Sequence, residues 1–436
     1  MRVLVCGATG FIGRPLSSAL LARGHDVIGA ARRPRPVSAG GRRSEVLAAD
    51  FARDVSMAAW LPRLAGVDAV VNAVGILRES RGPFAAPGRR HQRVEDVHAR
   101  APIALFDACL AAGVRRVVQL SALGADDEAA SAYHRSKRQA DRHLLSLPLS
   151  AAVVQPSLVY GPGGASATLF ETLASLPLLP LPAGGRQRVQ PLHLDDLVEA
   201  LCLLVERPAA APPGRIVFAG PEALALGEYL AVLRQGMKLP PARVVPVPSA
   251  LAHAAAAVAG WVSSLPLDRA ALQMLERGNT GPAAPLADLL GRAARAPSTF
   301  IDEAHAPAIR RSARLGWALP PLRASVAAVW IVTAVLSFGV YPVEESRLLL
   351  ARLGVGGAAA TVLLYGAAAL DLLLGAATLV LRRRRVLWWA QIALVLGYTA
   401  LITWRLPEFW LHPFGPILKN LPLLAAIGLL LALEDR

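Results

Sequence analysis

Two residues four positions apart suggest acid–base chemistry. Tyr133 and Lys137 enclose the segment Tyr-His-Arg-Ser-Lys, and on a helix positions i and i+4 share one face. A tyrosine hydroxyl, with an ordinary pKa of about 10, exchanges protons poorly at neutral pH, and a nearby ammonium group makes it a better acid. Ser121 lies twelve residues earlier and could orient a substrate carbonyl or hydroxyl. These three residues are therefore candidate catalytic residues for proton transfer.

A glycine-rich segment near the N-terminus predicts a binding site for a dinucleotide. It follows a strand pattern at Arg2–Cys6, opens a helix pattern at 11–23, and consists of Gly7, Ala8, Thr9, Gly10, Phe11, Ile12 and Gly13. The first glycine permits a tight turn, the second lets the backbone approach a pyrophosphate, and the third lets the helix pack close to the sheet. The helix N-terminus then faces the phosphates.

The end of the second strand indicates which dinucleotide is bound. NAD enzymes usually place an acidic residue there to hold the ribose 2′-hydroxyl. Here the strand at 26–30 is followed by Ala31, Arg32 and Arg33, and arginines can bind a 2′-phosphate. The sequence therefore favours NADP(H), with NAD(H) as the alternative. The structural alternative is that the two arginines are merely solvated.

Strand and helix patterns alternate through the first half of the chain. Helix patterns at 94–112 and 132–147 separate further strands at 68–72, 116–120, 151–155 and 216–219. This alternation predicts an α/β fold, a Rossmann doubly wound parallel sheet, with substrate-side insertions at 161–190 and 221–310. We expect an NAD(P)-binding domain at 1–220, a substrate-side or connecting segment at 221–316, and a membrane domain at 317–436.

The composition points to lipid rather than to nucleic acid. Of the 436 residues, 54% are hydrophobic, and the formal net charge is +15 at pH 7. The arginines are scattered and no nucleic-acid-binding signature is present, so no nucleic-acid partner is expected. Cys6, Cys109 and Cys202 are far apart in sequence, which predicts three buried thiols in a reducing compartment and no metal site.

Four apolar spans predict an all-α four-helix transmembrane bundle. They lie near 322–341, 357–381, 386–404 and 417–433, and each is long enough to cross about 30 Å of hydrocarbon. If residues 1–320 are cytoplasmic, the four arginines at 382–385 and the C-terminus are cytoplasmic too, as the positive-inside rule requires. We expect a multi-pass protein of a bacterial-type inner membrane. Tryptophans 317, 388, 389, 404 and 410 lie near the span ends and predict an aromatic belt.

Residues 1–220 resemble the short-chain dehydrogenase/reductase superfamily, through the Gly-x-x-Gly-x-x-Gly turn and the Tyr-x-x-x-Lys segment. Residues 114–125 and 265–279 resemble an atypical branch that includes the nucleotide-binding accessory subunit of respiratory complex I. Residues 190–197 resemble the segment of that branch that closes the pocket, although helix capping and packing are the alternative for His193 and Asp195. Residues 317–436, and above all 410–422, resemble the DoxX-like membrane family.

The superfamily resemblance implies further contacts with the cofactor. It implies that Asp50, with Phe51, contacts the adenine, and that Lys137 also holds the nicotinamide ribose. The segment Asn72-Ala73-Val74-Gly75 resembles the superfamily's Asn-Ala-Ala-Gly segment, in which small residues let the ribose and nicotinamide lie against backbone. One position departs from the pattern. Many members have an asparagine for the proton relay where this chain has His98 and Arg100.

Asp371, in the middle of the second span, is the one carboxylate that the spans place deep in lipid. Such a residue marks either a polar site that faces a lipid or quinone, or an interhelical hydrogen bond. Gln391, Lys419 and Asn420 are its candidate partners.

Two functions fit this sequence. The first is a membrane-anchored NAD(P)-dependent oxidoreductase, a reductase, dehydrogenase or epimerase, that transfers hydride to or from a small apolar or membrane-derived carbonyl or alcohol. The alternative is a non-catalytic NADP(H)-binding sensor, or an assembly module with a partner in a membrane complex. Membrane lipid is a partner in either case. Residues 78–93 and 221–310 are expected to shape the substrate pocket, and they do not identify the substrate.

Overall fold

The computed structural model describes residues 1–76, 92–129, 131–207, 214–259, 269–381, 383–413 and 415–434. The chain forms two compact units, Met1–Ala313 and Arg314–Arg436. The boundary falls inside one long helix, α11 (Ala306–Val335). Each unit is described by itself.

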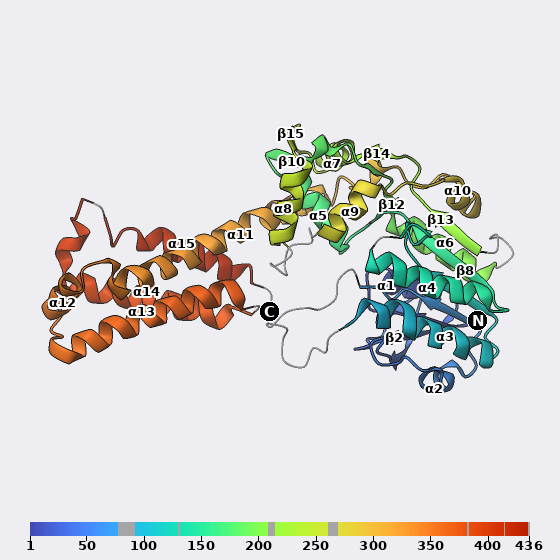
Figure 1. Ribbon diagram of the computed structural model, residues 1–436, viewed down its shortest axis with the longest axis horizontal. Coiled ribbons are helices and arrows are strands. Elements are labelled where there is room, and N and C mark those ends of the chain that lie inside the picture. The colour runs from blue at the N-terminus through green and yellow to red at the C-terminus, as the bar shows by residue number, and fades with distance from the viewer. Residues whose placement is uncertain are drawn as a thin grey trace. The chain divides into compact units, whose positions relative to one another are not determined.

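The first unit is built on a seven-stranded sheet in the order β13-β8-β7-β6-β1-β2-β5 (Figure 1). All neighbouring strands are parallel. The strands are β1 (Arg2–Cys6), β2 (Asp26–Ala31), β5 (Glu45–Ala48), β6 (Ala69–Asn72), β7 (Arg116–Leu120), β8 (Ser150–Pro156) and β13 (Gly214–Phe218). This arrangement confirms the predicted Rossmann-type sheet, and the carboxyl ends of its strands meet at one edge, where such sheets bind ligands.

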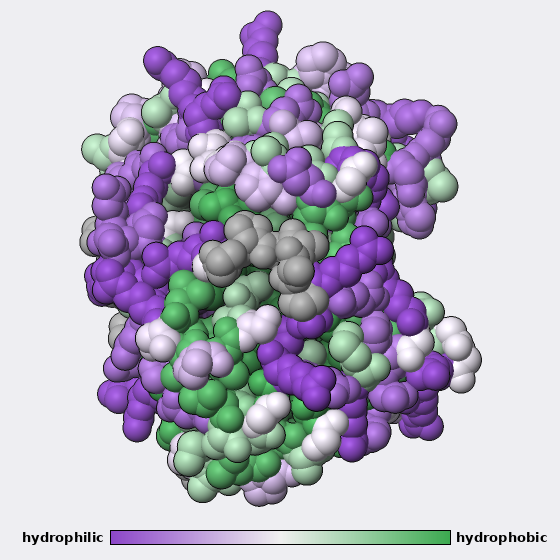
Figure 2. All heavy atoms as spheres, turned by 90° about the vertical axis from the view of Figure 1, so that its right-hand side faces the viewer, coloured by the Kyte–Doolittle hydropathy of each residue, from purple (hydrophilic) through white to green (hydrophobic). Residues whose placement is uncertain are grey.

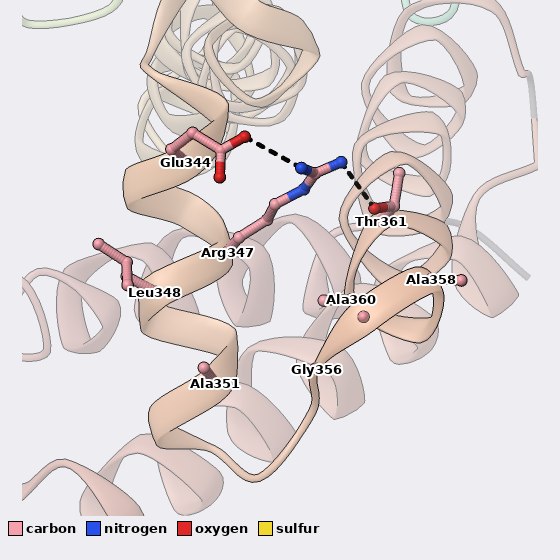
Figure 3. Close-up of a pocket in the computed structure, with 9 residues that line it drawn as sticks. Glu344, Arg347, Leu348, Ala351, Gly356, Ala358, Ala360 and Thr361 are labelled. Carbon is pink, nitrogen blue, oxygen red and sulfur yellow. Dashed lines mark hydrogen bonds and ion pairs between the residues drawn. The ribbon is translucent and has the colours of Figure 1, made fainter.

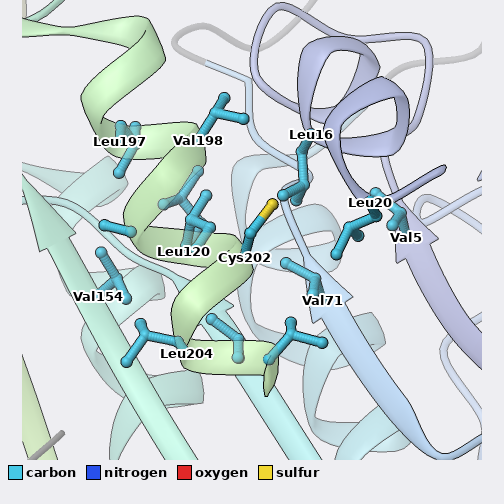
Figure 4. Close-up of a cluster of buried hydrophobic side chains, with 14 of the residues drawn as sticks. Val5, Leu16, Leu20, Val71, Leu120, Val154, Leu197, Val198, Cys202 and Leu204 are labelled. Carbon is cyan, nitrogen blue, oxygen red and sulfur yellow. The ribbon is translucent and has the colours of Figure 1, made fainter. Parts of the chain in front are cut away.

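Helices cover both faces of this sheet, because alternate residues of each buried strand point to opposite sides. Val3 and Val5 of β1 belong to the hydrophobic cluster with α1 (Gly13–Ala22) and α6 (Leu194–Glu206). Figure 4 shows this cluster, with Cys202 among its members. Leu4 and Cys6 belong to the opposite cluster, with α2 (Met57–Trp60), α3 (Ala101–Ala111) and α4 (Ala132–Ser146). All three cysteines are buried free thiols, as predicted.

The helix expected at 94–112 is not regular. It contains a π-helical turn, η2 (Asp96–Arg100), directly before α3. Pro102 lies at the start of α3, and a proline ring clashes with the carbonyl of the residue four positions earlier, here His98. Single π turns accommodate such a disruption and often mark functional sites. The turn places His98 in the interior, with 1% of its surface exposed.

The residues after β8 add a smaller region with its own core. Its hydrophobic cluster joins α5 (Ala165–Ala174) and α7 (Leu226–Gly236) and includes Tyr160, Tyr229 and Phe300. Paired short strands and helices complete it: β9 (Val159–Tyr160) with β12 (Leu192–His193), β10 (Leu178–Pro182) with β15 (Arg243–Val247), β11 (Arg188–Val189) with β14 (Leu224–Ala225), then α8 (Ser249–Ala259), α9 (Arg269–Arg277) and α10 (Ala284–Leu290). Most of the predicted pocket segment 78–93, and residues 265–268, lie outside the described residues.

Among the described residues, three helices are long and apolar enough to cross a membrane. They are Ala306–Val340, which begins in the first unit and includes α11, and α13 (Gly357–Val380) and α14 (Arg385–Arg405) of the second unit. The fourth apolar helix, α15 (Asn420–Ala432), has 13 residues. At 1.5 Å per residue it spans only about 20 Å, so it is shorter than the hydrocarbon layer. The predicted bundle is thus observed as three helices of spanning length and one shorter helix among the described residues. Arg382 of the predicted four-arginine signal lies outside them.

The surface of the second unit corrects one expectation. Trp389 and Trp404 have 60% and 74% of their surface exposed, as a belt requires, but Trp388 is fully buried. Its indole nitrogen donates to Glu434 Oε2 at 3.1 Å, and its ring belongs to the hydrophobic cluster inside the second unit. Figure 2 shows a face of the first unit, with hydrophilic side chains along both flanks and hydrophobic ones between them.

Candidate functional site

The glycine turn between β1 and α1 has the geometry of a phosphate cradle. Gly7 has φ +81°, and its nitrogen donates to the Ala30 carbonyl at 2.8 Å. A Cβ on Gly13 would lie 2.2 Å from the Gly7 carbonyl oxygen, so only glycine lets the helix start this close to the turn. Helix α1 has no side-chain cap and no acid in its first turn. Its N-terminus therefore suits an anionic pyrophosphate.

The other residues of the turn divide into exposed and packed positions. Thr9 and Gly10 are exposed, and Ala8 is buried beneath them. Phe11 and Ile12 are half-buried and pack against the hydrophobic cluster of α1 and α6. The exposed backbone at positions 9 and 10 is thus the part of the turn that a ligand can approach.

Arg32 and Arg33 follow β2 directly and are both exposed. Within the described part of the chain, neither side chain has a hydrogen bond or an ion pair, which leaves both guanidinium groups available to an anionic ligand. Asp50 is half-buried and its Oδ1 accepts from the Ala52 nitrogen at 3.1 Å. Phe51 is buried, with its ring edge-on to Trp60 at 5.1 Å. Any contact between Phe51 and a cofactor would therefore come from its backbone.

Hydrogen bonds to side chains of β7 and α4 hold the end of β6 and the segment after it. Asn72 donates to Gln119 Oε1 at 2.8 Å and accepts from the Val74 nitrogen at 3.2 Å. Lys137 Nζ donates to the Val74 carbonyl at 3.1 Å and to the Leu120 carbonyl at 2.8 Å. Ala73 is half-buried and Gly75 is exposed. This polar framework joins the predicted cofactor wall to helix α4.

Tyr133 lies in the first turn of α4, which Ser131 caps by accepting from the His134 nitrogen at 3.1 Å. Its ring meets His98 edge-on, with centroids 5.1 Å apart, and its hydroxyl makes no hydrogen bond to any described residue. Burial, followed by the charge of Asp141, raises the pKa of Tyr133 to about 12. The hydroxyl is therefore protonated at neutral pH and can donate its proton.

Asp141 is a buried member of the site that the sequence reasoning missed. Its Oδ2 accepts a hydrogen bond from the Ser121 hydroxyl, which is thereby directed at Asp141. Burial raises the pKa of Asp141 to about 6, and burial lowers the pKa of Lys137 to about 8 while the charge of Asp141 opposes that shift. The spacing 133, 137, 141 places these residues on one helix face, and extending the four-residue step would have found Asp141.

Residues 190–197, which are predicted to close the pocket, form capping, packing and ion-pair contacts. His193 caps α6, because its Nδ1 accepts from the Asp195 nitrogen at 3.2 Å, and its ring packs on Phe300 at 5.2 Å. Asp195 pairs with Arg295 at 2.8 Å. Gln190 donates to the Gly220 carbonyl at 2.6 Å. These contacts support the capping and packing alternative.

In the membrane unit, two of the residues predicted to pair with Asp371 form hydrogen bonds with other residues. Asp371 has 6% of its surface exposed and its Oδ1 is buried without a hydrogen bond. Gln391 instead donates to Thr378 Oγ1 at 2.8 Å, and Asn420 donates to Thr399 Oγ1 at 2.8 Å. Among the described residues, therefore, no interhelical hydrogen bond accounts for Asp371.

A cavity of about 540 Å³ lies at the N-terminal end of α13, beside α12 (Val343–Arg352). Figure 3 shows the Arg347 guanidinium group reaching from α12 toward Thr361 on α13. Arg347 donates to Thr361 Oγ1 at 2.9 Å and to Glu344 Oε1 at 3.0 Å. Its charge is thus already paired, and the remaining lining is mostly glycine and alanine.

The fold, the glycine turn and the Tyr133–Lys137 pair define a nucleotide-binding α/β domain joined to a membrane domain. Residues 3–220 match the model of the NAD dependent epimerase/dehydratase family, and residues 327–428 match the model of the DoxX-like family. The first match covers half of the chain, so the chain belongs to the NAD dependent epimerase/dehydratase family. The matches also confirm the two resemblances seen in the sequence, and with the apolar helices they make the chain a membrane protein.

Three curated proteins are similar to the first unit. A 3-diazoavenalumate denitrifying reductase from Streptomyces sp is 30% identical over 269 residues, 56% of this chain and 84% of that protein. A ceramide reductase from Caulobacter vibrioides (strain NA1000 / CB15N) is 31% identical over 208 residues, 47% of this chain and 61% of that protein. Subunit 9 of the NADH dehydrogenase (ubiquinone) 1 alpha subcomplex, a mitochondrial protein of Arabidopsis thaliana, is 26% identical over 259 residues, 58% of this chain and 62% of that protein. The chain thus spans less than two thirds of the last two.

A solved structure supports the same fold. A nucleoside-diphosphate-sugar epimerase from Staphylococcus aureus aligns with a TM-score of 0.55 and 16% identity, over 70% of this chain and all of that chain. At this identity the likeness concerns the fold alone.

Proposed function

We propose that this protein is a membrane-anchored, NADP(H)-dependent reductase of an apolar carbonyl substrate. The observation that carries the proposal is the position of Tyr133 and Lys137 on one face of α4, with Lys137 bonded to the carbonyl of Val74 at 3.1 Å. This contact brings the acid–base pair to the segment expected to line the cofactor. The nicotinamide supplies the hydride when it is bound.

The electrostatics of the site concern the proton that Tyr133 would donate. Burial raises the pKa of Tyr133 to about 12, so its hydroxyl carries a proton at neutral pH, and this proton could pass to a carbonyl oxygen that gains a hydride. Lys137 provides the positive charge that supports the loss of that proton, and it can hold the nicotinamide ribose. Ser121 is the third predicted catalytic residue; because its one proton is donated to Asp141, its oxygen could contact a substrate only as a hydrogen-bond acceptor.

The exposed arginines support NADP(H) as the cofactor. Gly7, Gly10 and Gly13 form the pyrophosphate cradle, and Arg32 and Arg33 are free to bind the 2′-phosphate. Asp50 would contact the adenine, and the segment from Asn72 to Gly75 would line the ribose and nicotinamide.

Two features support an apolar substrate. The chain carries its own membrane unit, which keeps the first unit close to lipid, and two similar proteins are named as reductases, one of ceramide. We further propose that the first unit and the C-terminus are cytoplasmic, in a bacterial-type inner membrane. The arginine-rich loop between α13 and α14 supports this orientation.

Replacement of the tyrosine hydroxyl tests this function. The full chain in mixed micelles would be supplied with NADPH and a panel of long-chain ketones and aldehydes, and NADPH consumption would be measured. Tyr133→Phe should lower turnover about a thousandfold while NADPH binding is kept. Tyr341→Phe, which removes an exposed hydroxyl elsewhere in the chain, should behave as wild type. Full turnover by the Tyr133 variant would overturn the proposed mechanism.

A second candidate function is a non-catalytic NADP(H)-binding module of a membrane complex. The observation that favours it is the similarity to the mitochondrial NADH dehydrogenase subunit. This function predicts NADPH binding without any turnover that depends on Tyr133. The same Tyr133→Phe comparison therefore separates the two candidates.

A further inference from the structure

His98 occupies a position between the expected cofactor wall and the catalytic helix. It lies in the π-helical turn η2, and 1% of its surface is exposed. Its Nε2 accepts a hydrogen bond from the Ile76 nitrogen at 2.9 Å. Its Nδ1 lies 3.3 Å from the Ser136 hydroxyl oxygen. Both ring nitrogens are therefore engaged with neighbours on different elements.

These contacts determine which nitrogen carries the proton. A backbone N–H can only donate, so Nε2 must be unprotonated and the neutral ring carries its proton on Nδ1. Ser136 donates its own proton to the Tyr133 carbonyl at 2.9 Å, so its oxygen is free to accept from Nδ1. The chain of donors runs in one direction, from His98 to Ser136 to the Tyr133 backbone.

The same ring helps to hold the wall of the site. Lys137 fixes the Val74 carbonyl at 3.1 Å, and His98 fixes the Ile76 nitrogen at 2.9 Å. Gly75 lies between these two anchors, and a Cβ placed on it would be 3.8 Å from both His98 Nε2 and Lys137 Nζ. The edge of the imidazole also meets the Tyr133 ring at 5.1 Å.

We propose that His98 is a positioning residue that acts as a neutral, tautomer-locked brace, and that it carries no protons during the reaction. Through Nε2 it sets the backbone at Gly75 and Ile76, and through its ring and Ser136 it sets Tyr133. A proton relay through this position would require Nε2 to gain a proton, which would break the bond to Ile76. This role rests on the proposed function only where Tyr133 acts in catalysis.

The tautomer can be measured without any turnover. The full chain in detergent, labelled with ¹⁵N-histidine, would be followed by NMR from pH 5 to pH 9, with the His98 signals assigned by their loss in His98→Gln. We expect one protonated and one unprotonated nitrogen, Nδ1 and Nε2 respectively, with no titration in this range. A ring protonated on Nε2, or one that titrates, would overturn the proposal.

Three variants separate the contacts of the ring. His98→Gln can keep an acceptor for Ile76, His98→Asn can keep a donor for Ser136, and His98→Phe keeps only the ring that meets Tyr133. The dissociation constant for NADPH should stay near wild type in His98→Gln and rise about tenfold in His98→Phe, because one buried hydrogen bond is lost. His143→Gln is the matched control, since His143 lies on α4 but pairs with Asp107 at 2.7 Å.

The pH profile distinguishes a brace from a relay. A brace lowers kcat in His98→Phe and leaves the pH at which activity falls unchanged, whereas a relay moves that pH. An unchanged NADPH dissociation constant in His98→Phe, or a moved profile, would contradict the proposal. If no substrate is reduced but the His98 ring carries its proton on Nδ1, the proposed function fails while the positioning role of His98 is supported.

Discussion

The two units bury polar side chains in different ways. In the first unit, the side chains around Val74–Ile76 are anchored to backbone groups: Lys137 donates to two carbonyls and His98 accepts from an N–H. In the membrane unit, Gln391 and Asn420 donate to threonine hydroxyls, while Asp371 Oδ1 is buried without a hydrogen-bond partner among the described residues, as Asp141 Oδ1 is in the first unit. An unpaired polar atom in an apolar surrounding costs free energy.

This difference bears on the groups that are proposed to react. Lys137 is hydrogen-bonded to backbone carbonyls on two segments, which holds it in one position for the proposed proton transfer. The side-chain amides of the bundle bond instead to threonine side chains, and the groups that are proposed to react all lie in the first unit.

The largest effect is expected at the glycine turn. In Gly13→Val the new side chain would collide with the Gly7 carbonyl, which should lower the free energy of unfolding of the first unit by about 3 kcal/mol or more and abolish NADPH binding. Gly397→Val is the control in the membrane unit, because no atom lies within 4 Å of its Cβ position. Thermal unfolding and NADPH titration check both. Equal stability of the two variants would show that the turn is not close-packed.

A smaller effect is expected from the buried carboxylate. Lys137, with a pKa of about 8, loses its charge as the pH rises through that value, so kcat should fall above about pH 8. Asp141 is the charge that raises the pKa of Lys137, so in Asp141→Asn the fall should move to lower pH, with severalfold less activity at pH 8. Asp127→Asn, which removes an exposed partner of Arg138 and Arg142, should leave the profile unchanged. If the pH at which kcat falls were unchanged in Asp141→Asn, Asp141 would not be the charge that acts on Lys137.

The smallest effect is expected in the bundle. Asp371→Leu removes an unpaired polar group and should stabilise the membrane unit by about 1 kcal/mol, with NADPH binding and kcat unchanged. Gln391→Leu breaks the bond to Thr378 and serves as the comparison. Thermal unfolding in detergent and the reductase assay check the pair. Loss of activity in Asp371→Leu would make the bundle part of the reaction.

Much of the first unit could be predicted from sequence because its signals are local. The strand at Arg2–Cys6 and the glycine turn follow from neighbouring residues, and Tyr133 and Lys137 share a helix face by their spacing alone. The exposed state of Arg32 agrees with the idea of a free anion-binding group, but its ligand stays a prediction.

The rest depends on contacts between distant residues. The π turn at His98 follows from the clash of Pro102 with a helix carbonyl, and periodicity alone does not reveal it. The buried indole of Trp388 donates to Glu434, 46 positions later in the chain, and the spacing of the tryptophans does not reveal this contact. The role of Asp141 depends on Ser121, which lies on another element.

The most direct test of the central claim is titration of the detergent-solubilised full chain with NADPH and with NADH, followed by nucleotide fluorescence. NADPH should bind about tenfold more tightly than NADH, and Arg32→Ser combined with Arg33→Ser should remove the difference. Arg35→Ser, an exposed arginine of the same loop, should not. Binding of neither nucleotide by the wild-type chain would contradict the account, because the glycine turn would then hold no cofactor.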